Sequence, residues 1–200
     1  AEQTSHLDFG VHAMLMGDDD VEGQVPELID MGVISFKMFM TYKKRPGRMC
    51  DDDYICNAMD LVASGGGVMQ LHCESGNIIE YLENKLIAEG HTHPTDFPRA
   101  CPDWAEEEAI NRAVQMSSAT RCPTYVVHLS THLGMERIKQ AQSLGQAVWT
   151  ETCPQYLLLS DAEMARVGPL AKIGPPLRAD DGPDREAMWR GLEQGHTSIV

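Results

Sequence analysis

Short apolar segments alternate with longer amphipathic segments along the chain. The apolar segments have the length and composition of β-strands, whereas the amphipathic ones carry apolar residues at helical spacing. Six strands are predicted, at residues 7–15, 32–39, 67–72, 124–128, 147–151 and 197–200. Helices are predicted between them, at residues 21–31, 52–63, 78–89, 105–119, 134–144 and 188–193. This alternation predicts parallel strands joined by helical crossovers.

Two architectures are compatible with this order of elements, a doubly wound open sheet and a (β/α)8 barrel. The first strands are not followed by GxGxxG, so a dinucleotide-binding sheet has no support. Three consecutive predicted strands contain, or end on, a residue able to hold a metal: Lys37, His72 and His128. A barrel brings the carboxyl ends of many strands to one point, whereas an open sheet spreads them along a line. We therefore predict an α/β fold of the TIM-barrel type.

The segment of residues 74–108 is long for a single crossover. It contains three prolines, at positions 94, 98 and 102, which break helices. We expect it to make an excursion over the mouth of the barrel. His91 and His93 resemble a metal-binding HxH pair, but they lie in this proline-rich loop and not on a strand. We do not expect them to bind a catalytic metal.

The charge of the chain limits its partners. It carries 30 acidic and 16 basic residues, a formal net charge of −14, which disfavours nucleic acids and anionic membranes. No apolar run has the length of a membrane span. Acidic runs at residues 18–20, 51–53 and 106–108 are predicted to lie in solvated loops or first helical turns. The six cysteines form no CxxC pair and no export signal opens the chain, so free thiols and a cytoplasmic location are preferred to disulfides.

Three strand residues are candidates for metal chemistry. A single histidine such as His72 is more often a hydrogen-bonded core residue than a ligand, but His128 repeats its position at the end of another apolar strand. Lys37 lies inside an apolar strand, where burying an ammonium group is unfavourable. It either extends to the surface, pairs with a carboxylate, or has a lowered pKa and reacts as a nucleophile. A lysine that has reacted with carbon dioxide presents a carboxylate-like group able to bridge two cations. His132 is expected in a surface loop.

Five motifs carry a resemblance to a known family. Residues 35–42, SFKMFMTY, resemble the SFKxFMxY signature of the dihydropyrimidinase and D-hydantoinase family of the amidohydrolase superfamily. Residues 71–75, 127–130, 151–157 and 174–178 resemble its HxEN, HxS, ETCPQYL and SPPLR segments. The five occur in the family's order. Two positions depart from the pattern, with Ser75 where asparagine is usual and Gly174 where serine is usual.

The resemblance implies roles for five residues. Lys37 would be carbamylated and would bridge two divalent metal ions, with zinc the expected metal, and His72 and His128 would be ligands of the second ion. Tyr42, which could otherwise be an ordinary core tyrosine, would be catalytic and bind substrate by stabilising the developing oxyanion. Gly174 would contact the substrate ring through its backbone. The departures at Ser75 and Gly174 leave the substrate open.

The resemblance also implies a reaction. It is the hydrolytic ring opening of a cyclic amide, a dihydropyrimidine or a 5-substituted hydantoin, to an N-carbamoyl amino acid. Allantoinase and dihydroorotase share the barrel and ligand set, and some relatives are non-catalytic scaffold proteins, so both alternatives stay open. A homotetramer is expected for the full-length protein.

The resemblance further indicates how much of a barrel is present. Residues 1–200 are expected to form one partial catalytic barrel domain, from about the third strand to the start of the eighth. No strand carries the family's first HxH pair, its final metal-binding aspartate would follow Val200, and its small β-domain is not expected here. We therefore expect these 200 residues alone to be inactive.

Overall fold

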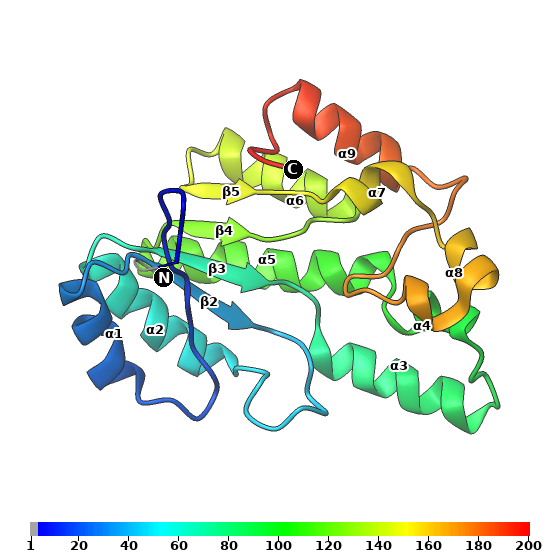
Figure 1. Ribbon diagram of the computed structural model, residues 1–200, viewed down its shortest axis with the longest axis horizontal. Coiled ribbons are helices and arrows are strands. Elements are labelled where there is room, and N and C mark those ends of the chain that lie inside the picture. Colours follow the sequence, from blue (N-terminus) through cyan, green and yellow to red (C-terminus); the bar gives the residue numbers. More distant parts are fainter. Residues whose placement is uncertain (1–3) are drawn as a thin grey trace.

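Five parallel strands form the centre of the computed structural model, which describes residues 4–200 (Figure 1). They are β1 (Ala13–Met14), β2 (Ser35–Phe39), β3 (Val68–His72), β4 (Thr124–Val126) and β5 (Val148–Thr150). Their spatial order is the same as their order along the chain. A parallel bridge between Glu151 and Ile199 extends the sheet where the sixth strand is predicted. A doubly wound sheet reverses its strand order at a switch point, so this sequential order is that of a barrel wall.

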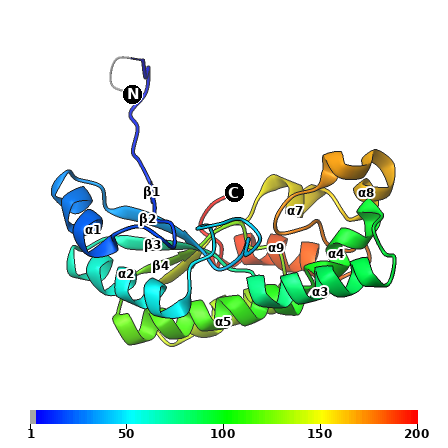
Figure 2. The same cartoon turned by 90° about the horizontal axis from the view of Figure 1, so that it is seen from below.

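Helices follow the strands, and several of them gather on one side of the sheet. They are α1 (Val21–Asp30), α2 (Asp52–Ser64), α3 (Gly76–Ala88), α4 (Phe97–Ala100), α5 (Asp103–Thr120), α6 (His132–Ser143), α7 (Pro154–Leu158), α8 (Ala162–Val167) and α9 (Asp184–Glu193). Two 3-10 helices, η1 (Pro94–Asp96) and η2 (Gly168–Ala171), complete the order. The helices α1, α2, α5, α6 and α9 contact one another in succession. Figure 2 shows α1, α2 and α5 backing the same face of the sheet.

The two faces of the sheet differ in what covers them. Alternate strand side chains are buried against the helices: Phe36, Met38, Met69, Leu71, Val126 and Val148. The side chains between them point to the other face, where one row is made of Met14, Lys37, Gln70, Tyr125 and Trp149. Met14 and Trp149 are exposed, and none of the helices that back the sheet lies on their side. A doubly wound sheet carries helices on both faces, whereas a barrel wall carries them on the outer face only, and the TIM-type fold is confirmed.

The first predicted strand is much shorter than expected. Residues 7–15 were expected to pair, but only Ala13–Met14 does, with Ala13 opposite Phe36 of β2. In that register, residues 7–12 would have to pair with residues 30–35, where α1 ends and a turn leads into β2. Without a partner strand for its hydrogen bonds the segment stays irregular, and its apolar side chains are exposed.

Residues 74–108 make the excursion expected of them. They form α3, η1, α4 and the first turn of α5. Figure 1 shows α3 and α4, together with α7 and α8, beyond the carboxyl ends of the strands, where a barrel has its active site. All six cysteines are free thiols, as predicted. Within residues 4–200, none of the helices combines the length and the apolarity that a membrane crossing requires.

Candidate active site

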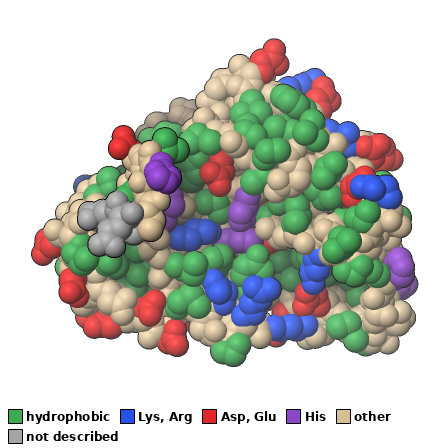
Figure 3. Space-filling view, viewed as in Figure 1, with side chains coloured by type: hydrophobic (Ala, Val, Ile, Leu, Met, Phe, Trp, Pro, Cys, Tyr) green, Lys and Arg blue, Asp and Glu red, His purple; other side chains and the backbone are tan. Residues whose placement is uncertain are grey.

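The two strand-end histidines meet, as their positions predict. His72 is the last residue of β3, and His128 follows two residues after β4 in a left-handed conformation with φ 44°. His128 Nε2 lies 3.0 Å from His72 Nδ1, and the ring centroids are 4.3 Å apart. Figure 3 shows histidine side chains at the bottom of a hollow in this face, with lysine and arginine side chains beside them. The pair therefore lies at the carboxyl edge of the sheet, open to the uncovered face.

The environment of both histidines favours neutral imidazole. Burial, reinforced by the nearby Lys37 ammonium, lowers the pKa of His72 well below its ordinary value. Burial lowers the pKa of His128 as well, with His72 and Lys37 adding to the effect. His72 Nε2 lies 2.7 Å from the Glu74 carboxylate, whereas the buried Nδ1 of His128 has no hydrogen-bond partner. A buried nitrogen without a partner is unfavourable, and neutral imidazole is the form that binds a metal.

Lys37 lies on the same face of the sheet, in β2. Its side chain is half buried and forms no ion pair with any carboxylate in residues 4–200. Its Nζ donates to the Met38 carbonyl at 3.2 Å and lies 4.5 Å from the centroid of the Phe39 ring. Burial lowers its pKa to about 7, against the opposing effect of Cys73 and Glu151. Of the three alternatives for Lys37, the lowered pKa and the lack of a described carboxylate partner favour an amine able to react with carbon dioxide.

These three residues are candidates for a metal site. Within the described chain, no three His, Cys, Asp or Glu side chains are grouped so as to hold a metal. Two neutral imidazoles and one reactive lysine are nevertheless a donor set suited to divalent zinc, manganese or iron once the lysine carries a carboxylate-like carbamate. The chemistry of these three side chains therefore fits the ligand positions that are expected of them in a two-metal centre.

Tyr42 is held beside the histidines by an unusual backbone conformation. It follows β2 with φ 68°, a region that non-glycine residues rarely adopt and that is often found at functional sites. Its ring centroid lies 5.0 Å from that of His72, edge to face. Burial raises the pKa of its phenol, and the neighbouring Glu74 adds to the shift. The phenol is therefore protonated at neutral pH and available to donate a hydrogen bond.

Gly174 is brought next to Tyr42 although 132 positions separate them in the sequence. A Cβ added at Gly174 would lie 2.9 Å from the Tyr42 hydroxyl and 3.8 Å from the Glu74 carboxylate. A separation under 3.0 Å is essentially never seen for a real Cβ, so only glycine leaves the phenol where it is. Glycine at this position therefore leaves room for the Tyr42 hydroxyl.

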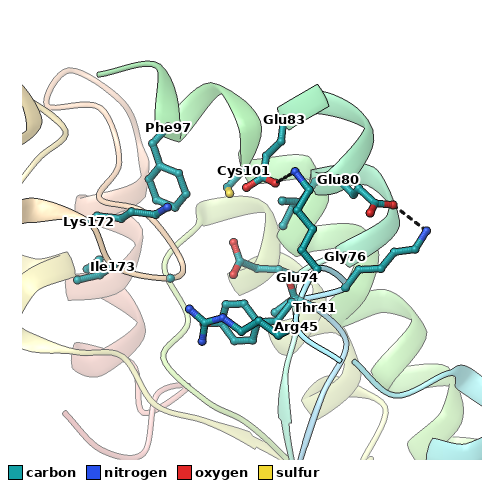
Figure 4. A pocket seen from close by; sticks show the side chains of 15 residues that line it. Thr41, Arg45, Glu74, Gly76, Glu80, Glu83, Phe97, Cys101, Lys172 and Ile173 are labelled. Carbon is teal, nitrogen blue, oxygen red and sulfur yellow. Dashed lines mark hydrogen bonds and ion pairs between the residues drawn. The ribbon is translucent and has the colours of Figure 1, made fainter. Parts of the chain in front are cut away.

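A cavity of about 350 Å³ adjoins these residues (Figure 4). Its polar lining includes Tyr42 and Glu74, and Gly174 forms part of its wall. Four side chains give it an apolar part: Ile79, Phe97, Cys101 and Ile173. A volume of this size is at the lower end of the range for small-molecule sites. The cavity is thus suited to a small ring compound that reaches the Tyr42 hydroxyl.

The importance of Glu74 was not predicted, and the prediction for Glu106 was wrong. Glu74 is buried, which raises its pKa to about 7 in spite of Arg178. Glu106 was expected in a solvated first turn of a helix, but it is 2% exposed and pairs with Arg178 at 2.7 Å. The helical spacing contained a signal, because Glu106 precedes buried Ala109 and Ile110 by three and four positions and so shares their face.

Glu106 also anchors the loop that follows His128. Its carboxylate accepts hydrogen bonds from the backbone N–H and the hydroxyl of Ser130, and Arg178 donates to the same hydroxyl at 3.0 Å. Ser130 is two residues from His128, so the buried network helps to fix the histidine's loop. No sequence signal links residues so far apart, because the network joins α5, the loop after β4 and the segment after η2.

The other histidines lie outside this group. His132 was expected in a surface loop, but it begins α6, and its Nδ1 lies 2.8 Å from Asp184, the first residue of α9. That carboxylate also accepts from the backbone N–H of His132, so the pair joins the two helices. His91 and His93 lie between α3 and α4, as expected, and His93 caps η1.

Comparisons with known proteins agree with the geometry. A scan against protein-family models gives no match. The D-hydantoinase of Geobacillus stearothermophilus is 34% identical over 199 residues, 97% of this chain and 41% of the relative. The allantoinase of Rubrobacter xylanophilus is 31% identical over 201 residues, 100% of this chain and 43% of the relative. The crystal structure of dihydropyrimidinase from Brevibacillus agri superimposes with a TM-score of 0.89 at 31% identity, over 96% of this chain and 42% of that one.

These matches have one feature in common. Each covers nearly all of this chain, but the chain spans only about two fifths of the length of the relatives. The similarity includes the strands that carry Lys37, His72 and His128, since almost every residue of the chain is matched. Over nearly its whole length the chain is therefore similar to members of the dihydropyrimidinase and D-hydantoinase family of cyclic amidohydrolases, as a partial match.

Proposed function

We propose that the protein containing these residues hydrolyses a cyclic amide, a dihydropyrimidine or a 5-substituted hydantoin, with two divalent metal ions. The observation that carries the proposal is the grouping of Lys37, His72 and His128 beside a cavity, whose lining residues Tyr42 and Glu74 both contact His72. Water adds to the ring carbonyl, the ring C–N bond breaks, and the released nitrogen gains a proton. The product is an N-carbamoyl amino acid.

The residues of the chain have separate tasks in this reaction. The carbamate of Lys37 would bridge the two metals, and the neutral rings of His72 and His128 would bind the second. Bound divalent metals lower the pKa of water and polarise carbonyl groups. Tyr42 donates a hydrogen bond to the ring carbonyl oxygen as negative charge develops on it. Glu74 orients the His72 ring through its 2.7 Å contact.

The direct test uses the complete gene product that carries these residues. Loaded with zinc or manganese in the presence of bicarbonate, it is expected to open the ring of dihydrouracil or 5-methylhydantoin. A chelator such as dipicolinate should abolish the activity, and added metal should restore it, because the hydroxide source depends on the metal. Release of the N-carbamoyl product is measured by chromatography. A folded, metal-loaded protein that opens no cyclic amide would refute the proposal.

Allantoin hydrolysis is the second candidate activity. The allantoinase relative is 31% identical, close to the 34% of the D-hydantoinase, so the identity alone separates the two weakly. Allantoin is a hydantoin with a ureido substituent, and its turnover is compared with that of 5-methylhydantoin in the same assay.

A non-catalytic scaffold is disfavoured by the close grouping of Lys37 with two neutral histidines. Zinc, a cytoplasmic location and the homotetramer are proposals that rest on the family resemblance.

Replacing Gly174 by alanine is expected to lower kcat/KM for a neutral hydantoin by about tenfold to a hundredfold. The new Cβ would lie 2.9 Å from the Tyr42 hydroxyl and force it away from the substrate carbonyl, and an ångström of misplacement is enough for such a loss. Steady-state kinetics measure the effect. Gly182→Ala is the matched control, because its added Cβ would meet nothing closer than 3.5 Å. Equal kcat/KM values for the two variants would show that the reaction does not depend on the position of the Tyr42 hydroxyl.

A further inference from the structure

Four basic side chains line the cavity that holds Tyr42, and only two of them are paired. Lys43 Nζ lies 2.8 Å from Glu80, and Lys44 Nζ lies 2.8 Å from Glu83 (Figure 4). The other two, Arg45 and Lys172, form no ion pair in the part of the chain that the structure describes. The cavity therefore has two positive charges at its mouth that no neighbouring carboxylate balances.

The two unpaired cations enter the cavity from different segments. Arg45 follows β2 in a turn closed by a 2.8 Å hydrogen bond from its N–H to the Tyr42 carbonyl. Its guanidinium lies 4.8 Å from the centroid of the Tyr42 ring. Lys172 follows η2, and its Nζ lies 4.5 Å from the centroid of the Phe97 ring. Figure 4 shows both cationic groups turned toward the space between them. Aromatic rings hold both groups in place without neutralising them.

The remaining acid of the cavity does not balance these cations. Glu74 is buried at the base of the cavity, 3% exposed, and contacts the imidazole of His72. Arg45 and Lys172 are both solvent exposed at the mouth. The chain as a whole has 14 more acidic than basic groups, so an unbalanced basic pair is contrary to its general composition. The positive mouth is a local feature of the cavity, and it attracts anions to that position.

The wall between the reacting end and the cations is apolar. Ile79, Phe97 and Ile173 line it, and none of the three offers a polar side-chain atom to a ligand. A ligand with its ring at Tyr42 would therefore pass a short apolar stem along this wall and present its far end to Arg45 and Lys172. A carboxylate is an end group that both arginine and lysine bind through charge-assisted hydrogen bonds.

We infer that the substrate is a cyclic amide whose ring substituent ends in a carboxylate, bound by Arg45 and Lys172. The inference rests on the proposed function in that it takes the cavity as the substrate site. It narrows the substrate class to acidic hydantoins or dihydropyrimidines, such as hydantoin-5-acetate. The two cations determine specificity and take no part in breaking the ring bond.

Binding of an inert ligand tests the inference without turnover. The probes are 2-oxoimidazolidine-4-acetate, which lacks the ring carbonyl that would be attacked, and its neutral carboxamide, which has nearly the same shape. Calorimetry on the metal-loaded complete gene product is expected to give at least about tenfold tighter binding of the acid. Arg45→Gln and Lys172→Gln should each weaken acid binding by roughly tenfold and change carboxamide binding much less. Lys85→Gln, at an exposed site on α3, removes the same charge outside the cavity and should leave both affinities unchanged.

Three results would overturn the inference. They are equal binding of acid and carboxamide, equal losses for both ligands in the two variants, and no binding of either ligand. Hydrolysis of hydantoin-5-acetate and 5-methylhydantoin is measured in parallel on the same samples. Selective acid binding without ring opening would support the anion site and contradict the hydrolase. Ring opening without any preference for the acid would do the reverse, so the two failures are distinguishable.

Discussion

Replacing Lys37 by alanine in the complete gene product is expected to abolish both metal binding and ring opening. Only lysine can form the carbamate that would bridge the metals, and alanine leaves the two imidazoles without an anionic ligand. We expect metal content to fall from about two ions per chain to less than one, and kcat/KM to fall by at least about 1,000-fold. Metal content is measured by mass spectrometry and turnover with 5-methylhydantoin.

The fold should survive this change. Lys37 is half buried on the uncovered face of the sheet and forms no ion pair with a described carboxylate, so its removal leaves no buried partner unsatisfied. Its neighbour in β3, Gln70, lies directly opposite on the same face, and Gln70→Ala is the matched control. The control should retain metal. A Lys37→Ala protein that keeps its metal content would contradict the bridging role, whatever its activity.

The largest loss of stability is expected from Glu106→Ala. Arg178 would keep its charge with its side chain 9% exposed and its main partner gone. The carboxylates of Glu106 and Glu74 hold the pKa of Arg178 above its ordinary value although burial lowers it. Breaking one side of a buried pair typically costs about 3–5 kcal/mol. The backbone N–H and hydroxyl of Ser130 would also lose their acceptor. Urea unfolding followed by circular dichroism measures the loss.

The neighbouring Glu107 provides the control for this prediction. It pairs with Arg137, whose side chain is 41% exposed, so Glu107→Ala should cost less than about 1 kcal/mol. A double variant, Glu106→Ala with Arg178→Met, removes both charges and is expected to recover part of the loss. If the Glu106 and Glu107 variants unfold at the same urea concentration, the pair contributes no more than a surface contact.

The local hydrophobic pattern predicted the secondary-structure elements well and the pairing of the strands poorly. The helix over residues 52–63 was predicted within one residue of Asp52–Ser64, because its apolar positions recur at helical spacing. The strand over residues 7–15 was wrong for residues 7–12, since a strand needs a partner and β2 begins only at Ser35. Alternation specifies which face a residue would have in a strand, and hydrogen bonds to another segment decide whether the strand forms.

The same division holds for the charged groups. A charged residue among apolar neighbours identified Lys37 from the sequence, because burial of a charge is unfavourable and therefore marks a special site. Glu106 was missed because its partner Arg178 is 72 residues away. The sequence also did not predict that Lys43 and Lys44 pair with Glu80 and Glu83 of α3 and leave Arg45 unpaired.

The sequence by itself determined the class of fold, the resemblance to a family, and the candidates Lys37, His72 and His128, which lie in or just after parallel strands. These follow from periodicity and short motifs, which are properties of neighbouring residues. The tertiary structure decided which groups meet: His72 with His128 and Glu74, Gly174 with Tyr42, and Glu106 with Arg178. The physical reason is that the free energy of a polar or charged group depends on its burial and its partners, and both are set by segments remote in sequence.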